Sequence, residues 1–592
     1  MLTEDYVNAL SYIKSRNYKT AILLLEKMHV INDRDVIFWS SFCYLKLSSF
    51  DKLLNLLQAQ KNLVENDYEL LKFKYYAGKY LNKTTVMISS LKKIIEKFPK
   101  NSSDFKIYAN LLIKLEKYEE TLIVLEKAKS LFPSEIDIEG RVFGLKMQIG
   151  DFSVYSIESI ESFEKMNFAY KVDSQKPPPS PFSLLAFIDD PKVHKKMSQN
   201  FARFNLAKMH YQEKKMQKPN EVQKKALQGI QKIKVGYYSS DYFSHATMRL
   251  IIDVFEQHDD DLFEFHHFSF SGVKMKNDIF GEKISNLPNF HDISSHNYNQ
   301  VKTITQRLGI QIAVDLKGYT QGARPEIFLN KVAPIQVNFL GYPGTLGDDI
   351  YDYIIADKIV IPDNSEKFYF EKVLRLPNCY QPNSQRMGLA QKKISREDIG
   401  VAEDAVLLGC FNNDYKVGIK EITIWAEVLQ QVPHAQLCLL CTNESSRVSY
   451  LNFFSSKKID LSRIKIFKRA PYEEHLLRIS IIDLALDTFN YNSHTTGSDY
   501  LYFNIPFVSK VGNSFPARVG ASLLNTIGLL DLVAKNESEY KELIIDLCLN
   551  KQKLLDARKR IFENKHILFD SKKFAADIEN LYKKIHQEEF LH

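Results

Sequence analysis

The chain has 592 residues, of which 45 % are hydrophobic and 26 % charged, and its formal net charge is +7. These values exclude a wholly disordered chain, a collagen-like fibre and a disulfide-stapled scaffold, and at roughly 100–200 residues per domain the length indicates three to five domains. A mild positive charge over this length does not indicate a nucleic-acid-binding protein.

The first 150 residues carry a repeat. The dipeptides at 98–99 and 132–133 are both Phe-Pro and stand 34 residues apart. An aromatic residue recurs at the expected turn between two helices, at Tyr18, Phe50, Tyr118 and Phe152, and Thr84 stands where one more would fall. A 34-residue helix–turn–helix period is typical of tetratricopeptide repeats, and its regularity argues against an irregular helical bundle. We predict an α-helical superhelix over residues 1–155 that binds protein or peptide partners; pairing of two chains into a homodimer is left open.

Residues 156–231 indicate a helical connector. The proline-rich run at 177–181 interrupts helix and must be extended. The residues at 184–187 form a short apolar plug, and residues 189–230 are predicted to form charged helices, including the stretch 213–216.

From residue 233 the pattern changes to strands alternating with helices. We predict strands at 232–238, 263–270 and 310–316, with a helix at 248–255. A second series starts near 405, with strands at 406–411, 435–441, 464–468, 482–486 and 507–510 and helices at 420–430, 473–479 and 496–503. This alternation predicts two parallel sheets, whose ligands lie beyond the carboxyl ends of the strands.

The two α/β lobes are predicted at 232–395 and, with the final helices, at 396–592. Two Rossmann-like lobes that face each other across a cleft resemble the GT-B arrangement of nucleotide-sugar transferases. Other two-domain enzymes share it, so the fold alone does not settle the function.

Cysteines and the chain start indicate a reducing compartment. Six cysteines are too few for a secreted scaffold, and Cys438 and Cys441 fall in an apolar run that predicts buried strand thiols instead of a metal or redox pair. The acidic start lacks the order of a signal peptide, and no run of 18 apolar residues predicts a membrane span. We therefore expect a cytoplasmic protein without membrane attachment.

Candidate ligand-binding residues in the second lobe follow strand ends. The segment 492–499 precedes a predicted helix, whose N-terminal N–H groups attract anions, and its Ser493, Thr495 and Thr496 could donate to a diphosphate or merely cap the helix. Lys416 could neutralise a leaving phosphate or be a surface lysine. His475 stands at another strand-to-helix turn, where it could bind a ligand or simply pack.

In the first lobe His245 is the candidate for a base or for a group that orients an acceptor, although a lone histidine can be structural. The glycine turns at 318–324 and 341–345 could bring backbone close to a ligand but match neither a Walker loop nor a dinucleotide fingerprint. His266 and His267 lack a third ligand at useful spacing, so we predict no metal site.

Several long motifs in order resemble the O-linked N-acetylglucosamine transferase family. They are VGYYSSD at 235–241 with His245, DLKGYTQGAR at 315–324, APIQVNFLGYPGT at 333–345, FNNDYK at 411–416, EEH at 473–475 and HTTGSD at 494–499. The resemblance runs from about 233 to 580, and tetratricopeptide repeats in front are also the family's arrangement. The stretch LPNCYQPN at 376–383 is similar to the bacterial branch.

The resemblance implies transfer of a sugar from a nucleotide donor to protein Ser or Thr hydroxyls, with inversion and without a metal or other cofactor. It implies that Lys416 holds the diphosphate, that His475 contacts the uracil and that Asp499 contacts the ribose. His245 would lie beside the acceptor hydroxyl. The remaining implied donor contacts are His494, Thr495 and Thr496 at the helix start and Asn413, where the family has a glutamine.

Three departures from the animal members keep alternatives open. A lysine is replaced by Tyr472, and a histidine near their active site by Gln311, which opens the donor identity and the acid–base details. The asparagine ladder of their repeats is absent, because Tyr76 and Gly144 flank Asn110 at the 34-residue offset. UDP-N-acetylglucosamine is the expected donor; GDP-fucose, UDP-glucose, or a repeat scaffold with an inactive transferase domain are the alternatives.

Overall fold

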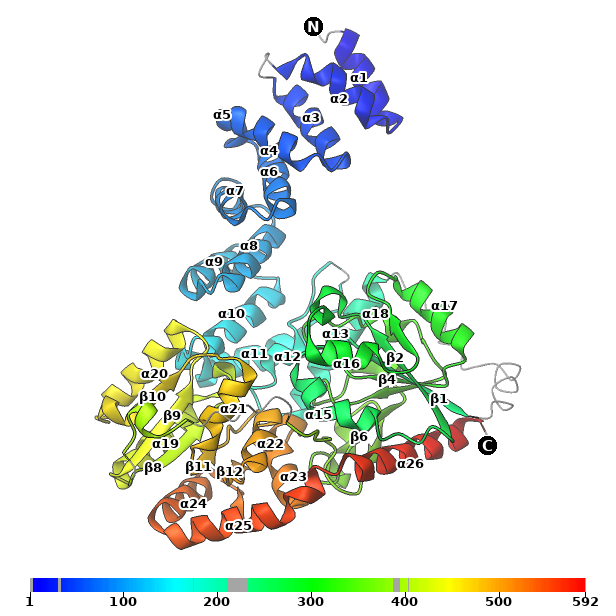
Figure 1. Cartoon of the computed structure of the whole chain (residues 1–592). Helices are drawn as coiled ribbons and strands as arrows, with labels where there is room; N and C mark the ends of the chain where they lie inside the picture. The colour runs from blue at the N-terminus through cyan, green and yellow to red at the C-terminus, as the bar shows by residue number, and fades with distance from the viewer. Residues whose placement is uncertain are drawn as a thin grey trace. The chain divides into compact units, whose positions relative to one another are not determined.

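The computed structural model describes residues 4–29, 33–173, 175–209, 232–386, 394–402 and 404–590 (Figure 1). The predicted charged helix around 213–216 lies outside these residues. The chain divides into two compact units, Met1–Val142 and Phe143–His592. The finer domain limits at 155, 231 and 395 stay predictions.

The first unit consists of helices that pack against their neighbours in the chain. They are α1 (Glu4–Lys14), α2 (Tyr18–Glu26), α3 (Arg34–Lys46), α4 (Phe50–Ala59), α5 (Lys61–Val64), α6 (Tyr68–Tyr80), α7 (Thr84–Lys97), α8 (Ser102–Lys114), α9 (Tyr118–Leu131) and the start of α10 (Ile136–Gln148). The second helix of successive pairs begins at Tyr18, Phe50, Thr84 and Tyr118. The predicted 34-residue helix–turn–helix period is therefore confirmed, including the place that Thr84 fills.

The connector continues from the end of α10 through η2 (Phe152–Tyr155), α11 (Ile157–Ala169), α12 (Pro181–Leu184) and α13 (Pro191–Lys208). Its apolar plug, residues 184–187, is buried as predicted. The connector contacts both lobes of the second unit: the Ser198 hydroxyl lies 3.3 Å from the Tyr342 hydroxyl, and Asn490 Nδ2 donates to the Ala186 carbonyl at 3.1 Å.

The first lobe is built on a parallel sheet with the order β3-β2-β1-β4-β5-β6-β7. Its strands are β1 (Ile233–Ser239), β2 (Phe263–Ser269), β3 (Phe290–Asp292), β4 (Ile312–Asp315), β5 (Ile335–Asn338), β6 (Tyr353–Ala356) and β7 (Lys372–Arg375). The helices of this lobe are α15 (Ala246–Phe255), α16 (Ile279–Ser285), α17 (Tyr298–Leu308) and α18 (Glu326–Leu329). The three strands predicted here correspond to β1, β2 and β4.

The second lobe repeats this plan with the order β10-β9-β8-β11-β12-β13. Its strands are β8 (Val406–Cys410), β9 (Ala435–Leu440), β10 (Ile464–Phe467), β11 (Leu484–Leu486), β12 (Phe507–Lys510) and β13 (Val533–Ala534). Its helices are α19 (Ile419–Gln431), α20 (Glu444–Ser456), α21 (Tyr472–Ser480), α22 (Thr495–Tyr502), α23 (Val519–Thr526), α24 (Glu537–Leu549) and α25 (Lys551–Leu568). The order 3-2-1-4-5-6 is that of a Rossmann fold, so the predicted pair of Rossmann-like lobes is confirmed.

The last helix, α26 (Ser571–Phe590), returns from the second lobe to the first, where it lies along the sheet (Figure 1). Glu579 on this helix accepts a hydrogen bond from the backbone N–H of Asp259 at 2.9 Å. Within the described ranges, no helix is long and apolar enough to cross a membrane.

Candidate active site

The strand order places a switch point in each lobe, between β1 and β4 and between β8 and β11, where chain connections leave in opposite directions. Ligands of doubly wound sheets bind beyond the carboxyl ends of the strands at such points. The segments that follow these four strands carry Asp241, Lys317, Lys416 and His494. The sequence-derived candidates therefore gather where the topology favours a ligand.

Lys416 ends the short turn η7 (Asp414–Lys416), which follows β8. Its ammonium group is almost fully buried, donates to the Asn492 carbonyl at 2.9 Å and lies 3.7 Å from the centre of the Tyr491 ring. No carboxylate among the described residues forms an ion pair with it. Burial lowers the pKa of Lys416 to about 7. The charge of Asp487 partly offsets this shift without forming an ion pair, so the ammonium group has no anion in direct contact among the described residues.

The loop before α22 brings Asn492 to this lysine because a buried carboxylate holds it. Asp487 accepts hydrogen bonds from the backbone N–H of Ser493 at 2.5 Å and from the hydroxyl of Ser509 at 2.5 Å. Asn492 Nδ2 in turn donates to the Thr488 carbonyl at 2.6 Å. The loop is thereby fixed without any use of the first N–H groups of α22.

The N-terminus of α22 is open. His494 occupies the N-cap position, and its side chain accepts no hydrogen bond from the helix. Its Nε2 lies 3.2 Å from the Pro516 carbonyl oxygen. Burial lowers the pKa of His494 well below the usual value, and the charge of the nearby Lys416 lowers it further. Thr495 and Thr496 form the first turn and are only partly buried. Uncapped N–H groups and the helix dipole beside a buried ammonium group make this place suited to an anion.

Asp499, on the next turn of α22, is engaged in the structure. Its Oδ1 accepts hydrogen bonds from Arg386 Nε at 2.7 Å and from the Tyr472 hydroxyl at 2.8 Å. The guanidinium of Arg249, from the first lobe, stacks on the Tyr472 ring at 3.6 Å. These contacts join α15, α21 and α22 across the two lobes. The sequence missed Arg249 and Arg386 because neither falls in a pattern that marks a ligand site.

The other two donor-side candidates lie around this cluster. His475 is on α21 with its ring 5.6 Å from that of Phe411, and burial lowers its pKa. Asn413 precedes η7, and its Oδ1 accepts a hydrogen bond from Arg469 Nη2 at 3.3 Å. Both side chains are partly exposed and remain accessible to a ligand.

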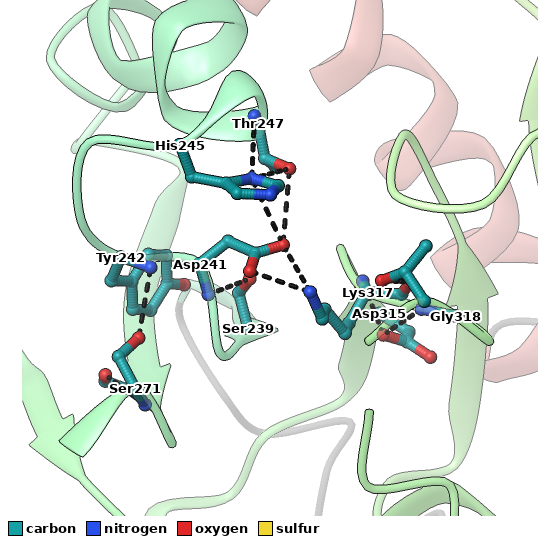
Figure 2. Close-up of polar contacts among 11 residues, drawn as sticks. Ser239, Asp241, Tyr242, His245, Thr247, Ser271, Asp315, Lys317 and Gly318 are labelled. Carbon is teal, nitrogen blue, oxygen red and sulfur yellow. Dashed lines mark hydrogen bonds and ion pairs between the residues drawn. The ribbon is translucent and has the colours of Figure 1, made fainter. Parts of the chain in front are cut away.

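In the first lobe His245 lies beside a buried ion pair (Figure 2). Asp241 follows β1 and accepts hydrogen bonds from Lys317 Nζ with both oxygens, at 2.7 and 2.8 Å. His245 Nδ1 lies 3.4 Å from Asp241 Oδ2 and 3.2 Å from the backbone nitrogen of Thr247. The neighbouring hydroxyl of Ser240 is buried and has no hydrogen-bond partner among the described residues.

The glycine turns approach each other closely. Gly318 has a φ of +55°, and a Cβ at this position would lie 2.4 Å from the Cβ of Tyr342. At Gly341 an added Cβ would lie 2.2 Å from the Leu316 carbonyl oxygen. These two glycines therefore let the two motifs pack against each other beneath the strand ends.

Gln311 does not lie at this site. It immediately precedes β4, at the end of the strand opposite Asp315, where its Oε1 accepts from the Lys234 backbone and its Nε2 lies 2.9 Å from His586 Nε2 on α26. The expectation that residue 311 bears on the acid–base chemistry is therefore wrong. Its contacts instead hold the last helix to the first lobe.

All six cysteines are buried free thiols, as predicted for Cys438 and Cys441, and burial raises the pKa of Cys438 to about 12. Among the described residues, no group of three or more His, Cys, Asp or Glu side chains is arranged so that it could hold a metal ion.

Comparisons with known proteins agree with the two-lobed architecture. A protein similar to this chain is "Probable UDP-N-acetylglucosamine--peptide N-acetylglucosaminyltransferase SEC" of Arabidopsis thaliana, with 30 % identity over 426 residues, 69 % of this chain and 43 % of that protein. Another is "Probable UDP-N-acetylglucosamine--peptide N-acetylglucosaminyltransferase SPINDLY" of Solanum lycopersicum, with 31 % identity over 363 residues, 59 % of this chain and 38 % of that protein. The chain thus spans less than half the length of these curated relatives.

A solved structure shares the fold over the whole chain. It is a mutant of an O-GlcNAc transferase from Thermobaculum terrenum, with a TM-score of 0.68 and 19 % identity, covering 100 % of this chain and 99 % of that one. The model of glycosyl transferase family 41 matches residues 177–392 and 390–578, which include both lobes and every candidate residue described above. The chain belongs to glycosyl transferase family 41.

Proposed function

We propose that the protein transfers a sugar from a nucleotide donor to Ser or Thr hydroxyls of other proteins, with inversion and without a metal. The observation that carries the proposal is the buried ammonium of Lys416 beside the uncapped start of α22. Burying a charge without an ion-pair partner in contact costs several kcal/mol, and a bound diphosphate would supply such a partner.

In this proposal Lys416, His494, Thr495 and Thr496 bind the diphosphate. As the bond between the sugar and the diphosphate breaks, negative charge grows on the leaving group, and donors already aimed at it stabilise the transition state. Removing one such donor typically costs roughly 10²–10³-fold in rate. His475 contacts the base, Asn413 and Asp499 complete the nucleotide site, and His245 lies beside the acceptor hydroxyl.

The expected donor is UDP-N-acetylglucosamine, in accord with the names of the relatives. GDP-fucose and UDP-glucose remain alternatives, because Tyr472 replaces a lysine of the animal members and donates a hydrogen bond to Asp499 at the proposed ribose site. We further propose that the helical repeats select the protein acceptors and that the enzyme works in the reducing cytoplasm, where its six free thiols would stay unpaired. Self-pairing through the repeats stays an open expectation.

Mass spectrometry of proteins co-expressed with the full chain tests the proposal. We expect a mass increment of one N-acetylhexosamine on Ser or Thr, and a hexose or deoxyhexose increment would identify the alternative donors. Lys416→Ala should abolish the modification while the circular dichroism spectrum is unchanged. Lys420→Ala is the matched control, because Lys420 is an exposed lysine on α19 with an ion pair to Glu537. Undiminished modification by Lys416→Ala would contradict the assignment.

A further inference from the structure

The ring of His245 is held by the start of α15 (Figure 2). His245 is the N-cap residue of that helix, and its Nδ1 accepts the backbone N–H of Thr247 at 3.2 Å. A backbone N–H can only donate, so Nδ1 must offer a lone pair. A neutral imidazole has a single N–H, which then resides on Nε2. The side chain is 39 % exposed, and Nε2 has no hydrogen-bond partner among the described residues.

Asp241 could favour the opposite tautomer, but its charge is already engaged. A carboxylate that holds an Nδ1–H usually does so at about 2.7–2.9 Å. Here Asp241 Oδ2 lies 3.4 Å from Nδ1, whereas Lys317 Nζ lies within 2.8 Å of both carboxylate oxygens. The ion pair is almost fully buried, so solvent screens it little. Lys317 therefore competes directly with His245 for the carboxylate.

The charges that face His245 also oppose protonation of the ring. Burial is the largest cause of its lowered pKa, and only Asp241 acts in the opposite direction. Lys317, Arg249 and Lys274 each lower the pKa further. These groups come from the segment after β4, from α15 itself and from the turn η3 (Gly272–Met275).

We infer that Thr247 and Lys317 are positioning residues that fix His245 as the Nε2–H tautomer, so that His245 donates a hydrogen bond into the cleft and does not act as a general base through Nε2. This inference rests on the proposed function for its chemical consequence but not for the tautomer itself. In the transfer, the acceptor oxygen bonds to the anomeric carbon while the bond from that carbon to the diphosphate oxygen breaks and the nucleoside diphosphate leaves with the electron pair. The acceptor oxygen is then an oxonium that loses its proton to water. His245 would keep its own proton throughout and hold an oxygen of the acceptor or of the sugar.

The tautomer is measurable in the enzyme without substrate. In protein labelled with ¹⁵N-histidine, we expect His245 Nδ1 to resonate as an unprotonated nitrogen and Nε2 as a protonated one, with His245→Asn used to assign the signals. A protonated Nδ1 in the neutral ring would overturn the inference. This result is independent of whether any sugar is transferred.

The role of Lys317 is tested by removing its charge. In Lys317→Met the carboxylate of Asp241 becomes free to attract the imidazole proton, so we expect a shift toward the Nδ1–H tautomer and a higher pKa for His245. Because Lys317→Met leaves a buried unpaired carboxylate, the double variant Asp241→Asn/Lys317→Met serves as a second test. It should retain the Nε2–H tautomer. An unchanged tautomer and pKa in Lys317→Met, or an Nδ1–H tautomer in the double variant, would overturn the positioning role.

Two substitutions separate a donor from a base in the transfer reaction. Asn at 245 can cap α15 and still donate through its amide, whereas Asp can cap the helix and accept a proton but cannot donate when ionised. We expect His245→Asn to retain at least about tenfold more kcat/KM than His245→Asp, since losing a hydrogen-bond donor at the reacting centre typically costs roughly 10²–10³-fold. Higher activity in His245→Asp would overturn the inference. If the wild-type enzyme transfers no sugar from UDP-N-acetylglucosamine, GDP-fucose or UDP-glucose, the proposed function is wrong. The tautomer measurement still tests the inference about His245 independently.

Discussion

Lys416 links donor binding to protonation. Burial brings its pKa to about 7, so at pH 8 most of the free enzyme carries a neutral amine there. A bound diphosphate favours the charged form, so binding above the free-enzyme pKa must take up a proton. We predict that the affinity for a nucleoside diphosphate falls as the pH rises above about 7, approaching tenfold per pH unit.

Calorimetry at pH 8 in two buffers of different ionisation enthalpy checks this prediction by counting the protons taken up on binding. His494 cannot supply the effect, because its pKa is lowered well below 6.5 and the ring is neutral at that pH. Lys416→Met is the matched control and should bind weakly, with neither proton uptake nor the pH slope. Binding by the wild type without proton uptake at pH 8 would contradict the assignment of Lys416 as the diphosphate ligand.

The Arg386–Asp499 pair gives a second prediction for single residues. Both side chains are almost fully buried and joined at 2.7 Å, so Asp499→Leu leaves a buried, unpaired guanidinium group. Breaking such a pair costs about 3–5 kcal/mol of unfolding free energy, while replacing both partners costs less. Urea unfolding should therefore show a larger loss for Asp499→Leu than for Asp499→Leu/Arg386→Met. An equal or larger loss in the double variant would show that the ion pair does not stabilise the second unit.

What the sequence predicts at this scale depends on how local the signal is. Lys416, His475 and His494 could be selected because each follows a recognisable strand end or opens a helix. Arg249 and Arg386 could not, because the partners that give them meaning, Tyr472 and Asp499, come from distant parts of the chain. For Gln311 the error came from the family comparison, which puts a histidine of the animal members near the active site, whereas here Gln311 precedes β4 at the end of the strand opposite Asp315.

Among the elements, the turns inside the helix pairs share a strained residue. Arg16, Ser48, Asn82 and Glu116 all have φ between 54° and 61°, and each stands two residues before the second helix of its pair. Gly150 occupies the corresponding place before η2, with φ of 69°. The left-handed conformation costs roughly 1–2 kcal/mol for residues with a Cβ, and glycine avoids that cost.

Glu116→Gly should therefore stabilise the last complete pair of the first unit. After the entropic cost of glycine, we expect a gain of about 0.5–1 kcal/mol. Glu116 is exposed, so little packing is lost with its side chain. Hydrogen exchange of amides in α8 and α9 should slow by about two- to fivefold. Glu116→Ala is the control and should give no gain, because its Cβ retains the strain; equal protection in the two variants would rule out strain at φ as the cause.

How well the boundaries of helices and strands could be predicted also depended on whether the signal was local in the sequence. The starts of α2, α4 and α9 could be predicted because an aromatic residue recurs at that place in four repeats, the fourth being Phe152 at η2. In the first lobe β3, β5, β6 and β7 were not predicted, since strands of three or four residues lack the length that separates a strand from a short apolar run. The equally short β4 was found because the apolar pattern around it extends over 310–316. The strand β5 even lies inside the motif at 333–345, whose family likeness gives no information on its conformation.

At the scale of the molecule, α26 ties the end of the chain to the first lobe. A continuous hydrogen-bond chain runs from the Tyr582 hydroxyl to that of Tyr237, on to His258 Nε2, and from His258 Nδ1 to Glu579 at 2.8 Å. A final helix was expected from the sequence, but its partner was not, because an apolar helix face does not specify the surface that it covers. The second lobe is thus linked to the first through α26 as well as through the segment between β7 and β8.

Glu579→Ala should weaken this attachment. It leaves the His258 ring N–H and the Asp259 backbone N–H without their shared acceptor, at a cost of about 1–3 kcal/mol for a buried orphaned donor. Burial chiefly lowers the pKa of His258, so the ring is neutral at pH 7 and needs an acceptor more than a charge. Glu579→Gln, which keeps an acceptor oxygen, should therefore remain close to the wild type in thermal unfolding and in hydrogen exchange of α26.

In the wild type and in Glu579→Gln the stability should fall as the pH drops below about 6.5, because His258 binds a proton more readily in the unfolded chain than in the folded one. A Glu579→Gln variant as unstable as Glu579→Ala would mean that α26 is held by an ionic contact to a protonated His258.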